Sequence, residues 1–370
     1  MSMLRTLTSI AVFVTALMSA SAHEAATAPY HVGEAQREFA PSVARDWRGA
    51  KTERLITTLW YPVDPRILEQ PHDIGFPGHA VFRGHPIAWG APLSAATRKY
   101  PLIVLSHGTG GSANDLDWLA SALAVNGYIV AGVNHPGNNA LGPLTRAGFM
   151  LWWERATDVS EVLDALLSDP VFGMHVDRQR IGAVGFSLGG YTVLELAGAR
   201  TDLKAFKRFC RSSAADAICH PPEMNRITTV AGDSPPAVMS PETLASIAKA
   251  GASYQDKRIK AVFAIAPALG EAFNGRSFAD VRIPVSLTAG TSDMTAPPDT
   301  NVRRIARLLP TSDVVMVQGA SHSTFLDTCV PQMIDQLARV CKDGSGIDRD
   351  AVHQQTARRV VGFFGHALRS

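Results

Sequence analysis

"RIGAVGFSLGGYT", from Arg180 to Thr192, decides how the rest of this sequence is interpreted. The apolar run ends in Gly-Phe-Ser-Leu-Gly, which fits the pattern G-x-S-x-G with Ser187 at its centre. In that pattern a buried strand turns sharply into a helix, and the serine hydroxyl is exposed at the end of the strand. Glycines flank the serine because a side chain at Gly185 or Gly189 would collide with the neighbouring strand or helix. The pentapeptide arises by chance in about one chain in ten of this length, so the surrounding sequence must decide its meaning.

Strands and helices alternate on both sides of this turn, which predicts a mostly parallel, doubly wound α/β sheet with helices on both faces. Ligands bind such sheets beyond the carboxyl ends of the strands. The loops of interest are therefore "SHGTGGS" (106–112), "NHPG" (134–137) and the turn at Ser187. The predicted strands lie within 55–62, 100–108, 128–137, 180–186, 259–270, 282–293 and 312–322, and the predicted helices within 117–127, 155–170, 189–199, 297–309 and 350–368.

One stretch breaks the alternation. Residues from about 201 to 256 are irregular in polarity and contain five prolines and two cysteines. A segment of this kind between two strands of a sheet is typical of an insertion. We expect it to form a cap over the site within a single domain, residues 23–370.

The amino-terminal residues have the pattern of a secretory signal peptide. Arg5 precedes a short apolar core, and Ala20-Ser21-Ala22 is a small-residue cleavage site, so residues 1–22 are predicted to be removed. The core is too short for a membrane span, and no later segment of the mature chain resembles one. The protein is therefore expected to be exported, to the periplasm or to the extracellular medium.

The bulk composition is that of an ordinary globular protein. The 370 residues are 46% hydrophobic and 18% charged, with a formal net charge of +2. Because no long basic run is present, nucleic acid is not expected to be the main partner.

The predicted export determines which oxidation state we expect for the four cysteines. An even number of cysteines in an oxidising compartment indicates disulfides, for which three connectivities are possible. The two local pairs are the simplest, each closing a short loop, and the spacings do not resemble a zinc site. These pairs are Cys210 with Cys219 and Cys329 with Cys341.

A nucleophilic serine needs a histidine base, and that histidine needs a carboxylate to orient it. In one widespread arrangement on a parallel sheet, the acid follows the serine in the chain and the histidine follows the acid. Asp293 and His322 fit that order, and each comes directly after an apolar strand. We therefore expect a catalytic triad of Ser187, Asp293 and His322.

Other acids and histidines fit less well. Asp280 and Asp313 precede strands, and Asp233 lies in the predicted insertion. A different role for Asp293 would be to cap the helix that starts near Pro297. The remaining histidines precede the serine, lie in the insertion or lie on the last helix; the ones considered are His107, His135, His220, His353 and His366.

Attack by a serine on a carbonyl carbon also needs backbone donors for the developing oxyanion. One is expected from Leu188, the residue after the nucleophile. The other is expected from the loop 106–112, where Thr109 is the candidate and Gly108 and Gly110 remain alternatives. No lysine follows this loop, so it does not fit a phosphate-binding loop. These groups imply neither a metal nor an organic cofactor.

With these residues in place, the sequence resembles α/β-hydrolases of the dienelactone-hydrolase-like and platelet-activating-factor-acetylhydrolase-like branch. The resemblance spans nearly the whole mature chain. It rests on "LWYP" (59–62), "LSHGTGG" (105–111), "VNHPGN" (133–138), "RIGAVGFSLGGYT" (180–192), "GTSDMTAPP" (290–298) and "GASHSTF" (319–325).

This resemblance implies the α/β-hydrolase fold and the hydrolysis of small-molecule or lipid-like carboxylic esters through an acyl-enzyme. Dienelactone hydrolases use a cysteine where this chain has Ser187, so ester hydrolysis is favoured over dienelactone activity. Three alternatives stay open: a peptidase or amidase, a polyester hydrolase, and a non-catalytic binding module on the same scaffold. For the polyester hydrolase, an aromatic cleft could be lined by Trp118, Trp152 and Trp153.

Overall fold

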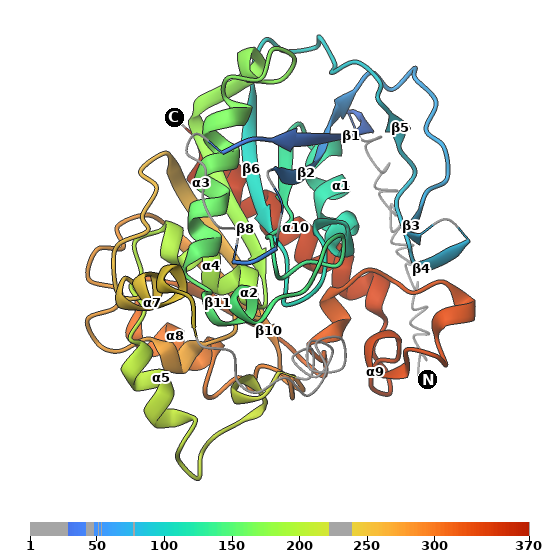
Figure 1. The fold of residues 1–370 in the computed structure, drawn as a ribbon. Helices are drawn as coiled ribbons and strands as arrows, with labels where there is room; N and C mark the ends of the chain where they lie inside the picture. Colours follow the sequence, from blue (N-terminus) through green and yellow to red (C-terminus); the bar gives the residue numbers. More distant parts are fainter. Residues whose placement is uncertain are drawn as a thin grey trace, which may run out of the picture.

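The computed structural model describes residues 29–41, 48–50, 52, 54–76, 78–221 and 239–369. The predicted signal peptide, residues 1–22, lies outside this described part. The described residues form a nine-stranded sheet with the strand order β11-β10-β9-β8-β6-β7-β2-β1-β5 (Figure 1). A separate hairpin pairs β3 (Asp73–Phe76) with β4 (His79–Arg83).

Six strands on one side of this sheet are parallel, as the alternation predicts. Continuous apolar runs form the central strands because helices cover both faces of the sheet, whereas β8 begins with a polar stretch and the edge strand β11 is only partly buried. All five residues of β7 are buried, for example. The six strands are β6 (Tyr100–Ser106), β7 (Ile129–Val133), β8 (Val176–Phe186), β9 (Ile259–Ile265), β10 (Val285–Gly290) and β11 (Asp313–Val317).

The other side of the sheet is mostly antiparallel. β2 (Leu55–Val63) pairs antiparallel with both β7 and β1 (His31–Phe39), and β5 (Ala88–Trp89) forms the edge. The sequence predicts β2 but not β1, whose central residues "EAQRE" are too polar to suggest a strand. Pairing with β2 along its whole length supplies the hydrogen bonds that stabilise β1.

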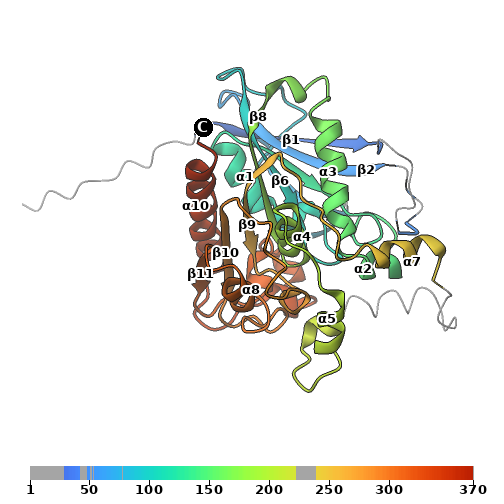
Figure 2. The same ribbon diagram turned by 90° about the vertical axis from the view of Figure 1, so that its left-hand side faces the viewer.

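Helices lie on both faces of the sheet. Figure 2 shows α1 (Asp117–Val125) and α10 (Arg349–Ala367) on one side and α3 (Glu154–Leu166) on the other. α4 (Leu188–Leu196) packs against α3 and against β8, the strand that leads into it. Shorter helices are α2 (Arg146–Met150), α5 (Leu203–Phe209), α7 (Pro241–Ala248), α8 (Val302–Leu308) and α9 (Ala338–Cys341).

The described residues of the stretch 201–256 form short helices joined by turns and loops. They include α5, a 3₁₀ turn at Ala217–Cys219, and α7, and the sheet resumes at β9. Residues 222–238 lie outside the described part. α7 packs beside the start of α3, where the Trp153 indole donates a hydrogen bond to Ser246 at 3.0 Å. No helix in the described ranges is long and apolar enough to cross a bilayer.

Candidate active site

Ser187 occupies the turn between β8 and α4 in a strained backbone conformation. Its φ is 56° and its ψ is −118°, a region that a non-glycine residue rarely adopts. The end of β9 and the loop after it hold Ser187 there, because the Ser187 N–H donates to the Ile265 carbonyl and the Ser187 carbonyl accepts from the Ala268 N–H. The hydroxyl is thereby presented at the carboxyl edge of the sheet.

The two glycines of the pattern are required by close packing. A Cβ on Gly185 would collide with the Gly189 backbone, and a Cβ on Gly189 would collide with the Ser106 carbonyl. The steric reason inferred from G-x-S-x-G therefore applies here. The same contacts bring the loop after β6 directly against the start of α4.

The structure brings Ser187, His322 and Asp293 into one hydrogen-bonded chain. His322 Nε2 lies 2.9 Å from the Ser187 hydroxyl, and His322 Nδ1 lies 2.7 Å from Asp293 Oδ2. All three residues are buried. A carboxylate only accepts hydrogen bonds, so Nδ1 carries the proton and the Nε2 lone pair faces the serine hydroxyl. This is the geometry that general-base activation of a serine requires.

The helix expected near Pro297 begins only at Val302, where Asn301 is the N-cap residue, so Asp293 does not cap it. Asp293 Oδ1 accepts the N–H groups of Thr295 and Ala296 at 2.9 and 2.7 Å, which fixes the turn before Pro297. Its other oxygen is left to orient His322. The rivals lie elsewhere in ion pairs: Asp280 pairs with Arg200, and Asp313 pairs with Arg359. Asp233 lies outside the described residues.

The glycine-rich loop passes beside the nucleophile. A Cβ on Gly108 would lie 3.4 Å from the Ser187 Cβ. Leu188 is the first residue of α4, where a backbone N–H has no acceptor within the helix. The Gly110 N–H donates to Asn138 Oδ1 at 2.7 Å, which occupies one of the alternative oxyanion donors. The backbone N–H groups of Thr109 and Gly108 remain as candidates for the second oxyanion donor, beside that of Leu188.

A buried polar network behind this loop was not predicted from the sequence. The Ser106 hydroxyl bonds His135 Nε2 at 2.9 Å, and His135 Nδ1 bonds Asp158 at 2.9 Å. Burial, more than any neighbouring charge, lowers the pKa of His135 to about 3, so this imidazole is neutral at pH 7. The Arg155 guanidinium donates to the His107 carbonyl at 2.7 Å. The only sequence signal for the network is that "SHG" and "NHPG" each place a histidine at a strand end.

The three tryptophans have different environments. Trp153 is fully buried, so it packs in the interior and does not line a cleft. Trp118 stacks on His353 with ring centroids 4.3 Å apart. Trp152 is half-buried and meets Phe206 of α5 edge to face at 4.8 Å. Trp152 and Trp153 therefore both join the insertion to the sheet domain, Trp153 through its hydrogen bond to Ser246.

Both disulfides of the structure are local. Cys210 is bonded to Cys219 within the insertion, and Cys329 is bonded to Cys341 just after the histidine turn. Of the three connectivities that the sequence leaves open, the structure has the pairing with the shortest loops. The described residues contain no group of three or more histidine, cysteine or acidic side chains that could hold a metal ion.

Comparisons with known proteins agree with this architecture. The chain is 27% identical over 150 residues to the platelet-activating factor acetylhydrolase of Cavia porcellus, covering 30% of this chain and 34% of the relative. It is 30% identical over 108 residues to cutinase est1 of Thermobifida alba, covering 29% and 33% of the two chains. The matched region thus spans about a third of the length of these relatives.

A solved structure matches over nearly the whole length. The ferulic acid esterase from Streptomyces cinnamoneus superposes with a TM-score of 0.60 at 21% identity, covering 94% of this chain and 92% of that one. At that identity the likeness concerns the fold. The sequence model of the Alpha/beta hydrolase family matches residues 103–339, which hold every member of the Ser187–His322–Asp293 chain. This protein belongs to the alpha/beta hydrolase family.

Proposed function

We propose that the protein is an exported serine hydrolase that cleaves carboxylic esters. Ser187 is the nucleophile, His322 the general base and Asp293 the acid that orients His322. The observation that carries the proposal is the continuous hydrogen-bonded chain from Asp293 through His322 to the Ser187 hydroxyl. Esters are favoured as substrates because the relatives include an acetylhydrolase and a cutinase.

The first half-reaction forms an acyl-enzyme. Ser187 Oγ attacks the ester carbonyl carbon while His322 Nε2 takes the hydroxyl proton. The Leu188 and Thr109 N–H groups stabilise the negative charge that develops on the carbonyl oxygen. When the tetrahedral intermediate collapses, the bond to the alcohol oxygen breaks and His322 gives that oxygen its proton.

The second half-reaction regenerates the enzyme. His322 removes a proton from water, and the resulting hydroxide attacks the acyl carbon. The carboxylic acid leaves as the bond to Ser187 Oγ breaks and the proton returns to that oxygen. Asp293 stays ionised throughout and stabilises the imidazolium.

Two further parts of the proposal concern the surroundings of the site. The insertion 201–256 acts as a cap, supported by the packing of α7 beside α3 and of α5 on Trp152. Export is supported by the two disulfides, which persist in oxidising compartments. Both the periplasm and the extracellular medium satisfy that condition.

The test is a chain-length series of p-nitrophenyl esters, from acetate to palmitate. Removing the nucleophile in Ser187→Ala should lower kcat on the order of 10⁶-fold. Ser168→Ala, which removes an exposed hydroxyl at the end of α3, is the matched control and should keep full activity. Turnover that persists in Ser187→Ala would reject this nucleophile, and no turnover by the unmodified protein would favour a binding module.

A matched p-nitroanilide series tests the amidase alternative. Clear turnover of the anilide would assign the protein to peptidases or amidases instead. The ester proposal predicts turnover of the ester without measurable turnover of the anilide, because an amine leaves less readily than a phenoxide and needs better protonation by His322.

A further inference from the structure

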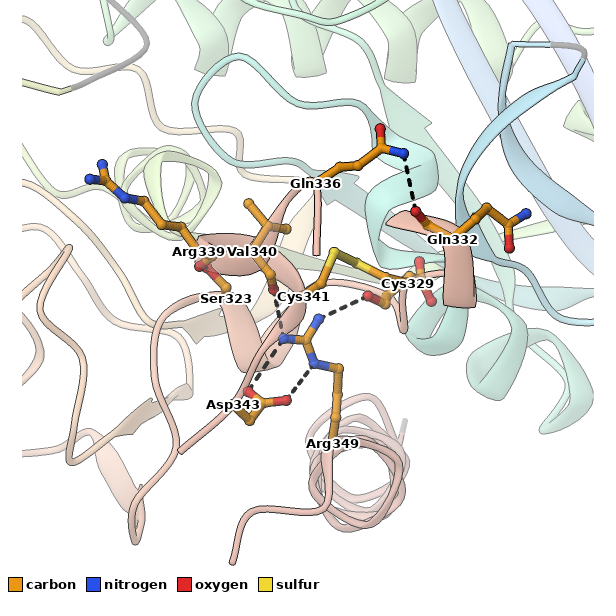
Figure 3. The surroundings of a disulfide bond; sticks show 10 residues. Ser323, Cys329, Gln332, Gln336, Arg339, Val340, Cys341, Asp343 and Arg349 are labelled. Carbon is orange, nitrogen blue, oxygen red and sulfur yellow. Dashed lines mark hydrogen bonds and ion pairs between the residues drawn. A yellow bond between two sulfur atoms is a disulfide. The ribbon is translucent and has the colours of Figure 1, made fainter. Parts of the chain in front are cut away.

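The turn that carries His322 is held from behind by a disulfide-closed segment. His322 directly precedes the 3₁₀ turn Ser323–Phe325, and Cys329 follows a few residues later. The chain then makes an excursion through α9 and returns at Cys341, which is bonded to Cys329 (Figure 3). The residues just after Cys341 lie against the histidine turn.

Thr324 is the contact point inside this turn. Its side chain is fully buried, and its hydroxyl accepts the Ser321 N–H at 2.9 Å. The single hydroxyl proton is donated to Asp343 Oδ1 at 2.5 Å. Ser321 is the residue immediately before His322, so this hydroxyl fixes the peptide that leads into the base.

Asp343 is held in turn by Arg349, at the start of α10. Arg349 Nε lies 2.8 Å from Asp343 Oδ2, and both side chains are about nine-tenths buried. The same guanidinium donates to the Asp327 carbonyl at 3.1 Å and to the Val340 carbonyl at 2.7 Å. It therefore binds the chain on both sides of the disulfide-closed segment, and Figure 3 shows its bonds to Val340 and Asp343.

The Cys329–Cys341 disulfide anchors the segment that carries Asp343. Cys329 packs with Ile74 and Phe82 in a small apolar cluster, which attaches the bridge to the β3–β4 hairpin. Asp343 lies two residues beyond Cys341, so the bond determines how far the Asp343 carboxylate can move from Thr324. Without it, the return of the chain would depend on noncovalent contacts alone.

We propose that the Cys329–Cys341 disulfide, Asp343 and Thr324 form a brace that positions His322 against Ser187. These are positioning residues, because none of them contacts the nucleophile. The inference rests on the proposed function for its effect on turnover. It predicts that the activity depends on the oxidation state of this disulfide and not on that of Cys210–Cys219.

The first test compares two substitutions of Thr324. Thr324→Val keeps the shape but removes the hydroxyl, and it should lower kcat for a p-nitrophenyl ester by about tenfold or more through displacement of the base. KM should stay nearly unchanged, because the ester still binds. Thr324→Ser keeps the hydroxyl and should restore kcat to within about threefold of the original. Equal kcat values in Thr324→Val and the unmodified protein would overturn the brace.

The second test uses the other disulfide as a matched control. The double variant Cys329→Ser/Cys341→Ser should lose kcat, whereas Cys210→Ser/Cys219→Ser should keep it. Dithiothreitol should reversibly inactivate the Cys210→Ser/Cys219→Ser variant, because its only remaining disulfide is Cys329–Cys341. Two electrons and two protons pass to that disulfide, and the reagent becomes a cyclic disulfide. Equal kcat values for the two double variants would contradict the proposal. This comparison also decides the question if Thr324→Val fails to fold.

A third measurement does not depend on turnover. The proton on His322 Nδ1, shared with Asp293, should give a downfield NMR resonance that is absent in His322→Ala. The brace predicts that this resonance is lost in Thr324→Val and kept in Thr324→Ser. An unchanged resonance in Thr324→Val would overturn the brace. If the protein cleaves no ester, the proposed function fails, while this resonance still tests the brace.

Discussion

At the scale of single residues, the site depends on which group accepts each hydrogen bond. The backbone N–H groups of Thr295 and Ala296 use one oxygen of Asp293, so only the other is left for His322. A carboxylate held this way imposes one tautomer on the imidazole. An amide of the same shape could instead donate to Nδ1 and favour the wrong tautomer.

Asp293→Asn should therefore lower kcat for p-nitrophenyl acetate by about 10⁴-fold with little change in KM. Asp280→Asn is the control, since Asp280 forms a half-exposed ion pair with Arg200 and should leave kcat unchanged. Steady-state kinetics at pH 7 measure both. Near-normal kcat in Asp293→Asn would mean that another group orients His322.

At the scale of elements, α4 contains a buried acid that the reaction does not use. Glu195 accepts hydrogen bonds from the Tyr191 hydroxyl at 2.6 Å and the Thr201 hydroxyl at 2.7 Å. Burial outweighs these bonds and raises the pKa of Glu195 to about 8. The folded protein therefore keeps a proton on Glu195 at neutral pH, whereas the unfolded chain releases it.

This difference predicts a stability that falls as pH rises. The contribution of Glu195 is fully present below its unfolded pKa of 4.5 and is lost as pH rises through about 8. Within that window the free energy of unfolding should fall by up to about 1.4 kcal/mol per pH unit. Glu195→Gln should remove the contribution of Glu195 to this slope. Burial also raises the pKa of Glu34 to about 8, so the contribution of Glu34 to the slope should remain in the variant.

Urea denaturation at pH 5.5, 7 and 8.5 measures the slope. Glu38→Gln removes an exposed carboxyl from β1 and should leave the slope as it is. A Glu195→Gln protein with the original slope would show that Glu195 is ionised in the folded state.

At the scale of the whole molecule, buried ion pairs join segments that are far apart in the chain. Arg48, just before β2, pairs with Asp158 of α3 at 2.7 Å, and both side chains are almost completely buried. The same guanidinium donates to the Pro136 carbonyl at 3.0 Å. Because Asp158 also bonds His135, this pair supports the network behind the glycine-rich loop.

Arg48→Met should lower the free energy of unfolding by about 3–5 kcal/mol, because it removes a buried guanidinium that donates two hydrogen bonds to Asp158. Arg66→Met is the matched control, since Arg66 pairs with Asp64 at the surface. Solvent screens that exposed pair, so its loss should change the free energy of unfolding far less. Chemical denaturation at pH 7 measures the free energy of unfolding of both variants. Equal decreases in the two variants would contradict the assignment of Arg48 to the buried network.

The amino-acid sequence by itself determined the parallel sheet and the strand ends at which Ser187, Asp293 and His322 lie. Those inferences rest on local features: continuous apolar runs, glycines beside the serine, and polar residues at strand ends. Parallel strands bring their carboxyl ends to one edge, so local placement and chain order were enough to predict which residues meet.

Only the tertiary structure decided what supports that site. β1 is too polar to predict and becomes a strand by pairing with β2. The choice of disulfide partners and the contact of Asp343 with Thr324 likewise depend on the path of the whole chain. Such contacts join residues brought together by packing of separate segments, and no periodicity or spacing in the sequence records which segments will be neighbours.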